Sequence, residues 1–172
     1  MLLGLCMPRY AAGQTKTDRQ IDRQRMERNI RHELAMLPYY TLFDNQEFRL
    51  EDDHTVVFSG QVVWAPLKDQ AETAVKEVEG VEKIVNNIEI LPVTPYDNTI
   101  RRRLYEAIYS QSGFDRYATQ AVPPIHIIVK NGNVTLEGVV DDKYDKSVAE
   151  MAAKSVPNVF SVTNNLRIRQ RE

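Results

Sequence analysis

The sequence contains very few of the residues that build catalytic and metal centres. There is one cysteine, Cys6, and only three histidines among 172 residues. A lone cysteine excludes an intramolecular disulfide and a cysteine-based metal site. No glycine-rich phosphate loop, nucleophile elbow or Cys/His ligand spacing occurs in the chain. Because so few titratable groups can converge, the sequence predicts a protein that is not an enzyme and that holds no cofactor.

Long apolar runs and a strong net charge are also missing. No run reaches the roughly 20 apolar residues that a membrane-spanning helix needs. The formal net charge of −2 gives no general attraction to nucleic acid or to an anionic membrane, so any such contact must come from a local patch. Nucleic-acid binding is not expected, since the predicted strands also lack the paired aromatic residues that stack bases.

The first 20 residues differ from the rest of the chain. Residues 1–7 are apolar but too few for a complete signal core, and no basic residue precedes them. Ala11, Ala12 and Gly13 provide small residues for cleavage before Gln14. We interpret residues 1–20 as the remnant of a secretory signal peptide or, alternatively, as a disordered tail. The first interpretation places the protein in the periplasm or cell envelope, and the second leaves it in the cytoplasm.

What the sequence does contain is an internal repeat. Shifted by 78 positions, residues 56–90 align without a gap with residues 134–168. The aligned positions that are identical are Val56/Val134, Gly60/Gly138, Val62/Val140, Ala71/Ala149, Ala74/Ala152, Lys76/Lys154, Val78/Val156, Val81/Val159, Asn86/Asn164 and Asn87/Asn165. Most identities fall on apolar or glycine positions, so the repeat indicates a shared core more than a shared active site.

The first unit is predicted to contain a helix, two strands, a helix and a strand. Met26, Ile30 and Leu34 form an apolar stripe on a charged helix, which Pro38 ends. The further elements are strands over 47–51 and 55–63, a helix starting at Pro66, and a strand over 81–91. Gly60 lies on the inward face of its strand, where we expect it to let the following helix approach closely.

The second unit repeats this order after a short linker, residues 91–95. Asp97 or Asn98 is expected to cap its first helix, and the Asn131-Gly132 pair predicts a tight hairpin. The expected elements that follow are strands over 125–129 and 134–140, a helix over 143–155 and a strand over 159–168. The predicted fold class is therefore α+β, with two tandem αββαβ modules at 21–92 and 96–170, each a small three-stranded sheet packed by two helices.

The pattern of residues that recurs in the two copies resembles that of the BON domain family. Its residues are Val134, Leu136, Gly138 and Val140, followed by spaced alanines and by Val159, Val162, Asn164, Asn165 and Leu166. The resemblance implies an αββαβ module, often in tandem, in periplasmic or outer-envelope proteins of the osmotically inducible and transport-associated kind. It also implies a link to osmotic or envelope stress and phospholipid binding or assisted transport, and it brings no established catalytic motif.

The candidate contact residues lie where the two copies differ. With Ile100, Leu104 and Ile108 inward, helical geometry places four residues on one exposed flank of the second module's first helix: Arg101, Arg102, Tyr105 and Tyr109. Arginines beside tyrosines suit an anionic phospholipid interface, and the alternative is a solvated helix whose tyrosines pack on the neighbouring domain. The insertion at 112–124 is a second difference.

Three further features have simpler interpretations. Trp64, at a strand-to-helix corner, is a second candidate contact or a cap on the core. The recurring Asn pairs (Asn86-Asn87 and Asn164-Asn165) are interpreted as a polar kink or bulge bonded to local backbone, and the alternative is a binding role. The run Asp52-Asp53-His54 is interpreted as an acidic turn.

Two functions from different classes therefore remain. One is a non-catalytic envelope module that binds an anionic phospholipid surface peripherally, in envelope maintenance or stress. The alternative is a protein–protein interaction or scaffold module of a cell-envelope or transport assembly.

Overall fold

The computed structural model describes residues 16–120 and 122–170, and its elements follow the predicted order. The helices are α1 (Lys16–Ala35), α2 (Pro66–Lys76), α3 (Pro95–Tyr109), α4 (Asp115–Ala118) and α5 (Lys143–Lys154). The strands are β1 (Asn45–Leu50), β2 (Thr55–Val62), β3 (Lys83–Asn86), β4 (Glu89–Ile90), β5 (Ile125–Lys130), β6 (Asn133–Val140), β7 (Ser161–Asn164) and β8 (Arg167–Ile168). The predicted α+β class with two αββαβ modules is confirmed. The expected signal remnant or tail at 1–20 lies outside the described residues up to residue 15, and α1 already begins at Lys16.

The two sheets have the same topology. In the first, β2 pairs antiparallel with β1 and parallel with both β3 and β4. In the second, β6 pairs in the same way with β5, β7 and β8. β3 with β4, and β7 with β8, are thus the two halves of one interrupted third strand.

An asparagine causes each interruption. The side-chain oxygen of Asn86 accepts a hydrogen bond from the Ile88 N–H, and its amide nitrogen donates to the Lys68 carbonyl of α2 at 2.9 Å. Asn164 repeats both contacts, with Leu166 and with Lys146 of α5. The polar-kink interpretation is confirmed, and the kink is also tied to the helix that covers the sheet.

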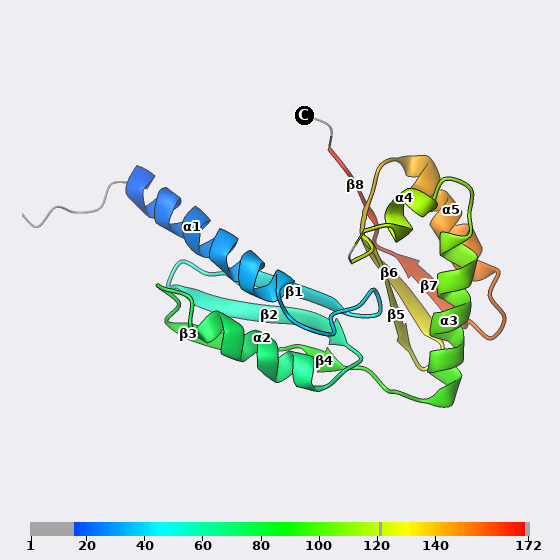
Figure 1. Cartoon of the computed structure of the whole chain (residues 1–172), viewed down its shortest axis with the longest axis horizontal. Coiled ribbons are helices and arrows are strands. Elements are labelled where there is room, and N and C mark those ends of the chain that lie inside the picture. Colours follow the sequence, from blue (N-terminus) through cyan, green and yellow to red (C-terminus); the bar gives the residue numbers. More distant parts are fainter. Residues whose placement is uncertain (1–15, 121, 171–172) are drawn as a thin grey trace, which may run out of the picture.

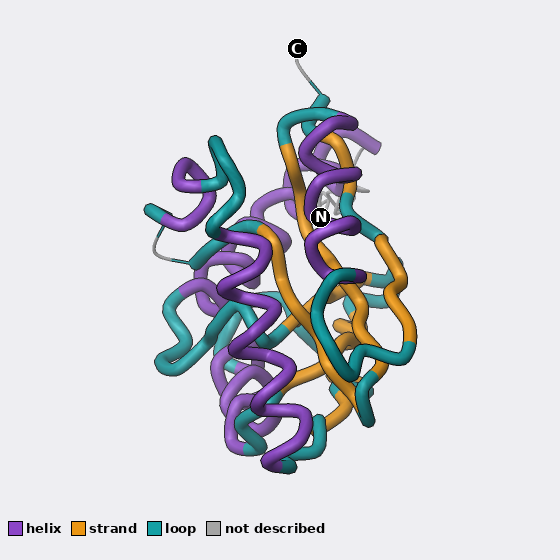
Figure 2. Tube along the Cα trace, turned by 90° about the vertical axis from the view of Figure 1, so that its right-hand side faces the viewer, coloured by secondary structure: helices purple, strands orange, loops and turns teal. Residues whose placement is uncertain are grey.

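Helices cover one face of each sheet and enclose a separate core. α1 and α2 contact each other over the first sheet, and α3 and α5 do so over the second (Figure 1). Among the largest fully buried side chains are Phe58 and Ile30 in the first core, and Tyr117, Phe114 and Leu104 in the second. Figure 2, turned by 90° from Figure 1, shows the helices (purple) lying beside the strands (orange) as a separate layer.

The glycine at the repeat's centre is required by a neighbouring strand. Gly60 and Gly138 have φ angles of +101° and +113°, which L side chains rarely adopt. A Cβ atom there would lie 2.0 Å from the Asn45 carbonyl oxygen and 1.9 Å from the Pro124 carbonyl oxygen, respectively. The expectation that Gly60 admits the following helix is therefore wrong, because the close backbone belongs to β1.

The two modules are docked against each other through the loop at 39–44. The Ile127 N–H of β5 donates to the Leu42 carbonyl at 2.7 Å, and Leu42 and Phe43 pack against the second core. Asp44 is buried and stiffens the loop by accepting hydrogen bonds from the N–H groups of Thr41 and Val63. In Figure 1, α3 and α5 lie on the outer side of the second sheet, so its helix-free face is turned toward the first module.

The start of α3 differs from the prediction. The helix begins at Pro95, and the Thr94 hydroxyl is the N-cap, accepting from the Asp97 N–H at 3.0 Å. Asp97 is instead fully buried, and its two carboxylate oxygens accept from the Asn131 and Gly132 N–H groups. The expected cap at Asp97 or Asn98 is wrong because Pro95 at the first helical position moves the start upstream.

The 112–124 insertion contains α4, which binds to α5 and to the segment after β6 within the second module. The guanidinium of Arg116 pairs with Asp141 at 3.1 Å and with the buried Asp145 of α5. The Tyr117 hydroxyl also donates to Asp145, at 2.5 Å. Arg116 and Tyr117 of α4 thus hold this helix to α5 and to the end of β6.

Candidate functional site

Two of the four residues predicted on the exposed flank of α3 are buried. Arg101 is 3% exposed and Tyr109 is 9% exposed. Arg101 donates to the Val129 carbonyl at 2.7 Å and to the Pro92 carbonyl at 3.1 Å. The Tyr109 hydroxyl donates to the Ile125 carbonyl at 2.7 Å. The prediction that these two side chains face a membrane or partner is wrong.

The physical reason is that α3 lies against β5, so the sheet's edge covers the flank beside the apolar stripe. Arg101 joins the interdomain linker at Pro92 to the end of β5 at Val129. Burial lowers the pKa of Arg101, and the nearby Asp97 carboxylate opposes this shift. Helical periodicity alone could not show this, because it assigns a direction on the helix but no neighbour.

The remaining exposed residues form a smaller contact surface, the α3 face, made of Arg102 and Tyr105, while Arg103 lies on the opposite flank of the helix. Both arginines are exposed, and neither pairs with a carboxylate in the part of the chain that the structure describes. Tyr105 is 40% exposed, and its ring centroid lies 5.1 Å from that of Tyr109. The α3 face therefore presents one positive charge beside a half-buried ring, and Arg103 adds a second charge on the other flank.

Trp64 is exposed, as a contact residue must be, and it has a partner that the sequence did not reveal. Its ring makes an edge-on contact with Tyr39, with centroids 4.9 Å apart, and Tyr39 is 72% exposed. We name these two residues the aromatic pair. Tyr39 has a φ of +67°, which turns the chain after α1 and brings its ring to Trp64. The only available signal was Pro38, which predicts a turn without its direction.

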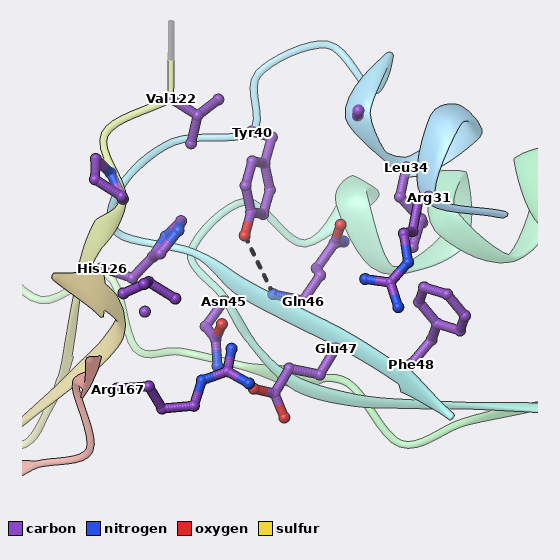
Figure 3. A pocket seen from close by; sticks show the side chains of 14 residues that line it. Arg31, Leu34, Tyr40, Asn45, Gln46, Glu47, Phe48, Val122, His126 and Arg167 are labelled. Carbon is purple, nitrogen blue, oxygen red and sulfur yellow. Dashed lines mark hydrogen bonds between the residues drawn. The ribbon is translucent and has the colours of Figure 1, made fainter. Parts of the chain in front are cut away.

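A cleft of about 670 Å³ lies between the two modules (Figure 3). Its first wall comes from the end of α1 and from β1, and its second wall from β5, β6, β8 and the insertion. The lining residues are Arg31, Leu34, Ala35, Tyr40, Asn45, Gln46, Glu47, Phe48, Val122, Pro124, His126, Gly138, Val139 and Arg167. Sequence reasoning missed this cleft because its walls come from segments far apart in the chain.

The aromatic residues of the cleft are neutral at pH 7. Burial raises the pKa of Tyr40 to about 12, and its hydroxyl accepts from the Gln46 N–H. Burial also lowers the pKa of His126, although the Asp44 carbonyl and carboxylate oppose the shift. The rings of Tyr40 and His126 lie 5.7 Å apart, across the two modules. The charge of the cleft therefore comes from Arg31, Arg167 and Glu47.

Both halves of the chain match one family model. The match to the BON domain covers residues 27–92 and again residues 96–170. The chain belongs to the BON domain family. No curated protein matches this tandem BON domain protein significantly.

Two solved structures resemble the tandem BON chain distantly. One is CdsD, a structural protein of the Type III secretion system of Chlamydia trachomatis, with 12% identity and a TM-score of 0.35 over 86% of this chain and 94% of that one. The other is the C-terminal domain of CdsD, with 12% identity and a TM-score of 0.34 over 83% and 96%.

The acidic turn of this BON domain protein has local structural tasks. Asp52 pairs with Arg23 of α1 at 2.8 Å, and Asp53 accepts from the Thr55 N–H at 3.1 Å. Within residues 16–120 and 122–170, no group of three His, Cys, Asp or Glu side chains is arranged to hold a metal ion. None of the helices in these ranges is both long and apolar enough to cross a bilayer.

Proposed function

We propose that this tandem BON domain protein is a non-catalytic module of the cell envelope that attaches peripherally to an anionic phospholipid surface. The family supports the non-catalytic and envelope parts of this proposal. The contact would be made by the α3 face of the second module. Arg101 and Tyr109 have no part in it, because they hold α3 to β5 and to the linker.

The observation that carries this proposal is the exposure of Arg102, free of carboxylate partners among the described residues, beside Tyr105, with exposed Arg103 adding charge on the opposite flank of α3. Arg102 lies three residues before Tyr105, so the two side chains share one side of the helix. Each arginine near an anionic surface contributes about 1 kcal/mol, and a tyrosine ring lies favourably at the boundary between headgroups and acyl chains. Two such charges give a reversible, salt-sensitive attachment.

Arg102→Glu is expected to weaken binding to phosphatidylglycerol vesicles by about thirtyfold at low salt, because it exchanges one attraction of about 1 kcal/mol for a similar repulsion. Co-sedimentation at increasing vesicle concentration measures this change. Tyr105→Ala should weaken binding as well. Phosphatidylcholine vesicles, which carry no net charge, should bind neither the unchanged protein nor the two variants.

Arg25→Glu is the matched control, since Arg25 is an exposed arginine on α1 of the first module. Its affinity for the vesicles should stay within about threefold of that of the unchanged protein, because only the net charge of the protein changes. Equal losses in Arg25→Glu and Arg102→Glu would assign the attraction to net charge and contradict a surface on α3.

The alternative is a protein partner, and the aromatic pair is the observation that favours it. Tyr39 and Trp64 are uncharged, large and exposed, and such residues dominate the binding energy of protein interfaces. Met36, three residues before Tyr39, is exposed as well.

If the aromatic pair is a protein contact, Trp64→Ala should abolish a stoichiometric crosslink to an envelope protein in cells, while vesicle binding stays unchanged. Exposed Tyr144→Ala on α5 is the control and should keep the crosslink. A crosslinked partner that Trp64→Ala leaves in full yield would contradict a role for the aromatic pair.

A further inference from the structure

Among the described residues each sheet has two edges, and the edges at β1 and β5 are partly covered. An open edge presents free N–H and C=O groups that can pair with a strand of another chain. At β1, the Gln46 N–H donates to the Tyr40 hydroxyl, and Arg23 donates to the last carbonyl of the strand. At β5, the Ile127 N–H donates to the Leu42 carbonyl of the loop at 39–44. Part of each of these edges is thus occupied by the chain itself.

The opposite edges, at β3 and β7, occupy equivalent places in the repeat but differ in charge. Glu82 and Lys83, at the start of β3, are exposed, and charged residues on an edge oppose its pairing with another strand. Shifted by 78 positions, the same places hold Phe160 and Ser161, and β7 contains no charged residue. The structure agrees with this alignment, because the N–H groups of Glu82 and Phe160 donate to the hairpin turn of their own module, at 3.2 and 2.9 Å. β7 therefore has the backbone of β3 without its charges.

The free backbone groups of β7 belong to Ser161 and Thr163. The Phe160 N–H points toward the β5–β6 turn, and backbone groups of successive strand residues point to opposite sides. The N–H and C=O groups of Ser161 and Thr163 therefore point away from β6. Both residues are exposed, and within residues 16–120 and 122–170 neither backbone forms a hydrogen bond outside the sheet.

Phe160 places an exposed ring at the start of this edge. The residue is 72% exposed, and the first module has Glu82 at the same place, so the fold does not require an aromatic side chain there. The ring centroid lies 6.1 Å from that of the exposed Tyr96, and both rings lie against Gly132. Two exposed rings beside an open, uncharged strand mark an interaction surface.

We propose that β7 pairs antiparallel with β7 of a second copy of this chain, around a two-fold axis at Val162. Such an axis brings identical surfaces together, so a charged edge would repel its own copy, whereas the uncharged β7 does not. In this register Ser161 lies opposite Thr163 of the second copy, and the two residues exchange both backbone hydrogen bonds. Their hydroxyl groups can also bond across the strands. The second modules of the two copies then share one continuous sheet.

The experiment is sedimentation velocity of the full chain at increasing concentration. Because β7 has only four residues, we expect a reversible dimer with a Kd of about 10–100 μM, as for small transient interfaces. Ser161→Lys should weaken the dimer by about tenfold or more, since it brings two equal charges close to the axis. Phe160→Glu should weaken it as well. Both variants carry residues that the first module has at the same places, so they should fold normally.

Thr73→Lys is the matched control, because it adds the same charge at an exposed position of α2 in the first module. Its Kd should stay within about twofold of that of the unchanged protein. A second measurement is hydrogen exchange of the Ser161 and Thr163 amides, which should slow with rising concentration in the unchanged protein and not in Ser161→Lys.

Three outcomes would overturn the proposal. The first is a monomer at every concentration. The second is a dimer that Ser161→Lys weakens no more than Thr73→Lys does. The third is a dimer that Phe160→Glu weakens and Ser161→Lys does not, which would assign the contact to the aromatic rings in place of the strand.

Discussion

Gly138→Ala is expected to lower the free energy of unfolding by about 4 kcal/mol. Its backbone has a φ of +113°, a conformation that costs an alanine about 1–3 kcal/mol. The new methyl group would also lie 1.9 Å from the Pro124 carbonyl oxygen, and relieving such overpacking costs a further 1–3 kcal/mol or so. Because the Pro124 carbonyl belongs to the backbone of the adjacent segment, no side-chain rotation can remove the clash. Urea unfolding followed by far-UV circular dichroism measures the loss.

The internal repeat supplies its own controls for this prediction. Gly60→Ala should cost a similar amount in the first module, because its Cβ would lie 2.0 Å from the Asn45 carbonyl oxygen. Ser59→Ala, at the exposed neighbouring position, should change stability by less than about 0.5 kcal/mol. A Gly138→Ala protein as stable as the Ser59→Ala protein would show that the strands do not approach as closely as the structure has them.

Asp97→Ala is expected to destabilise the second module by about 3 kcal/mol. The Asp97 carboxylate is fully buried and accepts the N–H groups of Asn131 and Gly132, at 3.1 and 2.9 Å. Alanine leaves the buried Gly132 N–H without an acceptor, at a cost of about 1–3 kcal/mol, and removes the acceptor of the part-buried Asn131 N–H at a smaller cost. It also removes the carboxylate that offsets the desolvation of Arg101. The same urea experiment measures this change.

Glu106→Ala is the matched control on the same helix, since Glu106 is an exposed carboxylate without such contacts. It should stay within about 0.5 kcal/mol of the unchanged protein. Thr94→Ala, which removes only the helix cap, should lie between the two at about 1 kcal/mol. An Asp97→Ala protein that loses no more than Glu106→Ala would contradict the assigned role of Asp97 in holding the hairpin to α3.

The fold could be predicted from the sequence because the repeat places the same apolar positions in the same order twice. Val56 and Val134, Val62 and Val140, and Ala71 and Ala149 are all buried in the structure, as core positions must be. The Asn86 and Asn164 kinks were also predictable, since a short amide side chain can bond its local backbone. Their second contact, to the covering helix, depends on tertiary packing and has no local signal.

The candidate site was predictable only in part. Tyr105 and Arg102 are exposed as expected, but Arg101 and Tyr109 are buried because α3 lies over β5. Helical periodicity gives the direction of a side chain, whereas its burial depends on which strand and linker lie there. The aromatic pair and the interdomain cleft were out of reach for the same reason. Both depend on how the chain turns after α1 and how the loop at 39–44 docks on the second module.

Contact between the α3 face and an anionic membrane can be measured directly by paramagnetic relaxation. Vesicles of phosphatidylglycerol with a headgroup spin label would be added to the ¹⁵N-labelled full chain, and backbone amide signals compared before and after. We expect selective broadening of the amide signals of Arg102 and Tyr105, and loss of this broadening at high salt. Broadening confined to Tyr39 and Trp64, or no broadening at low salt, would contradict it.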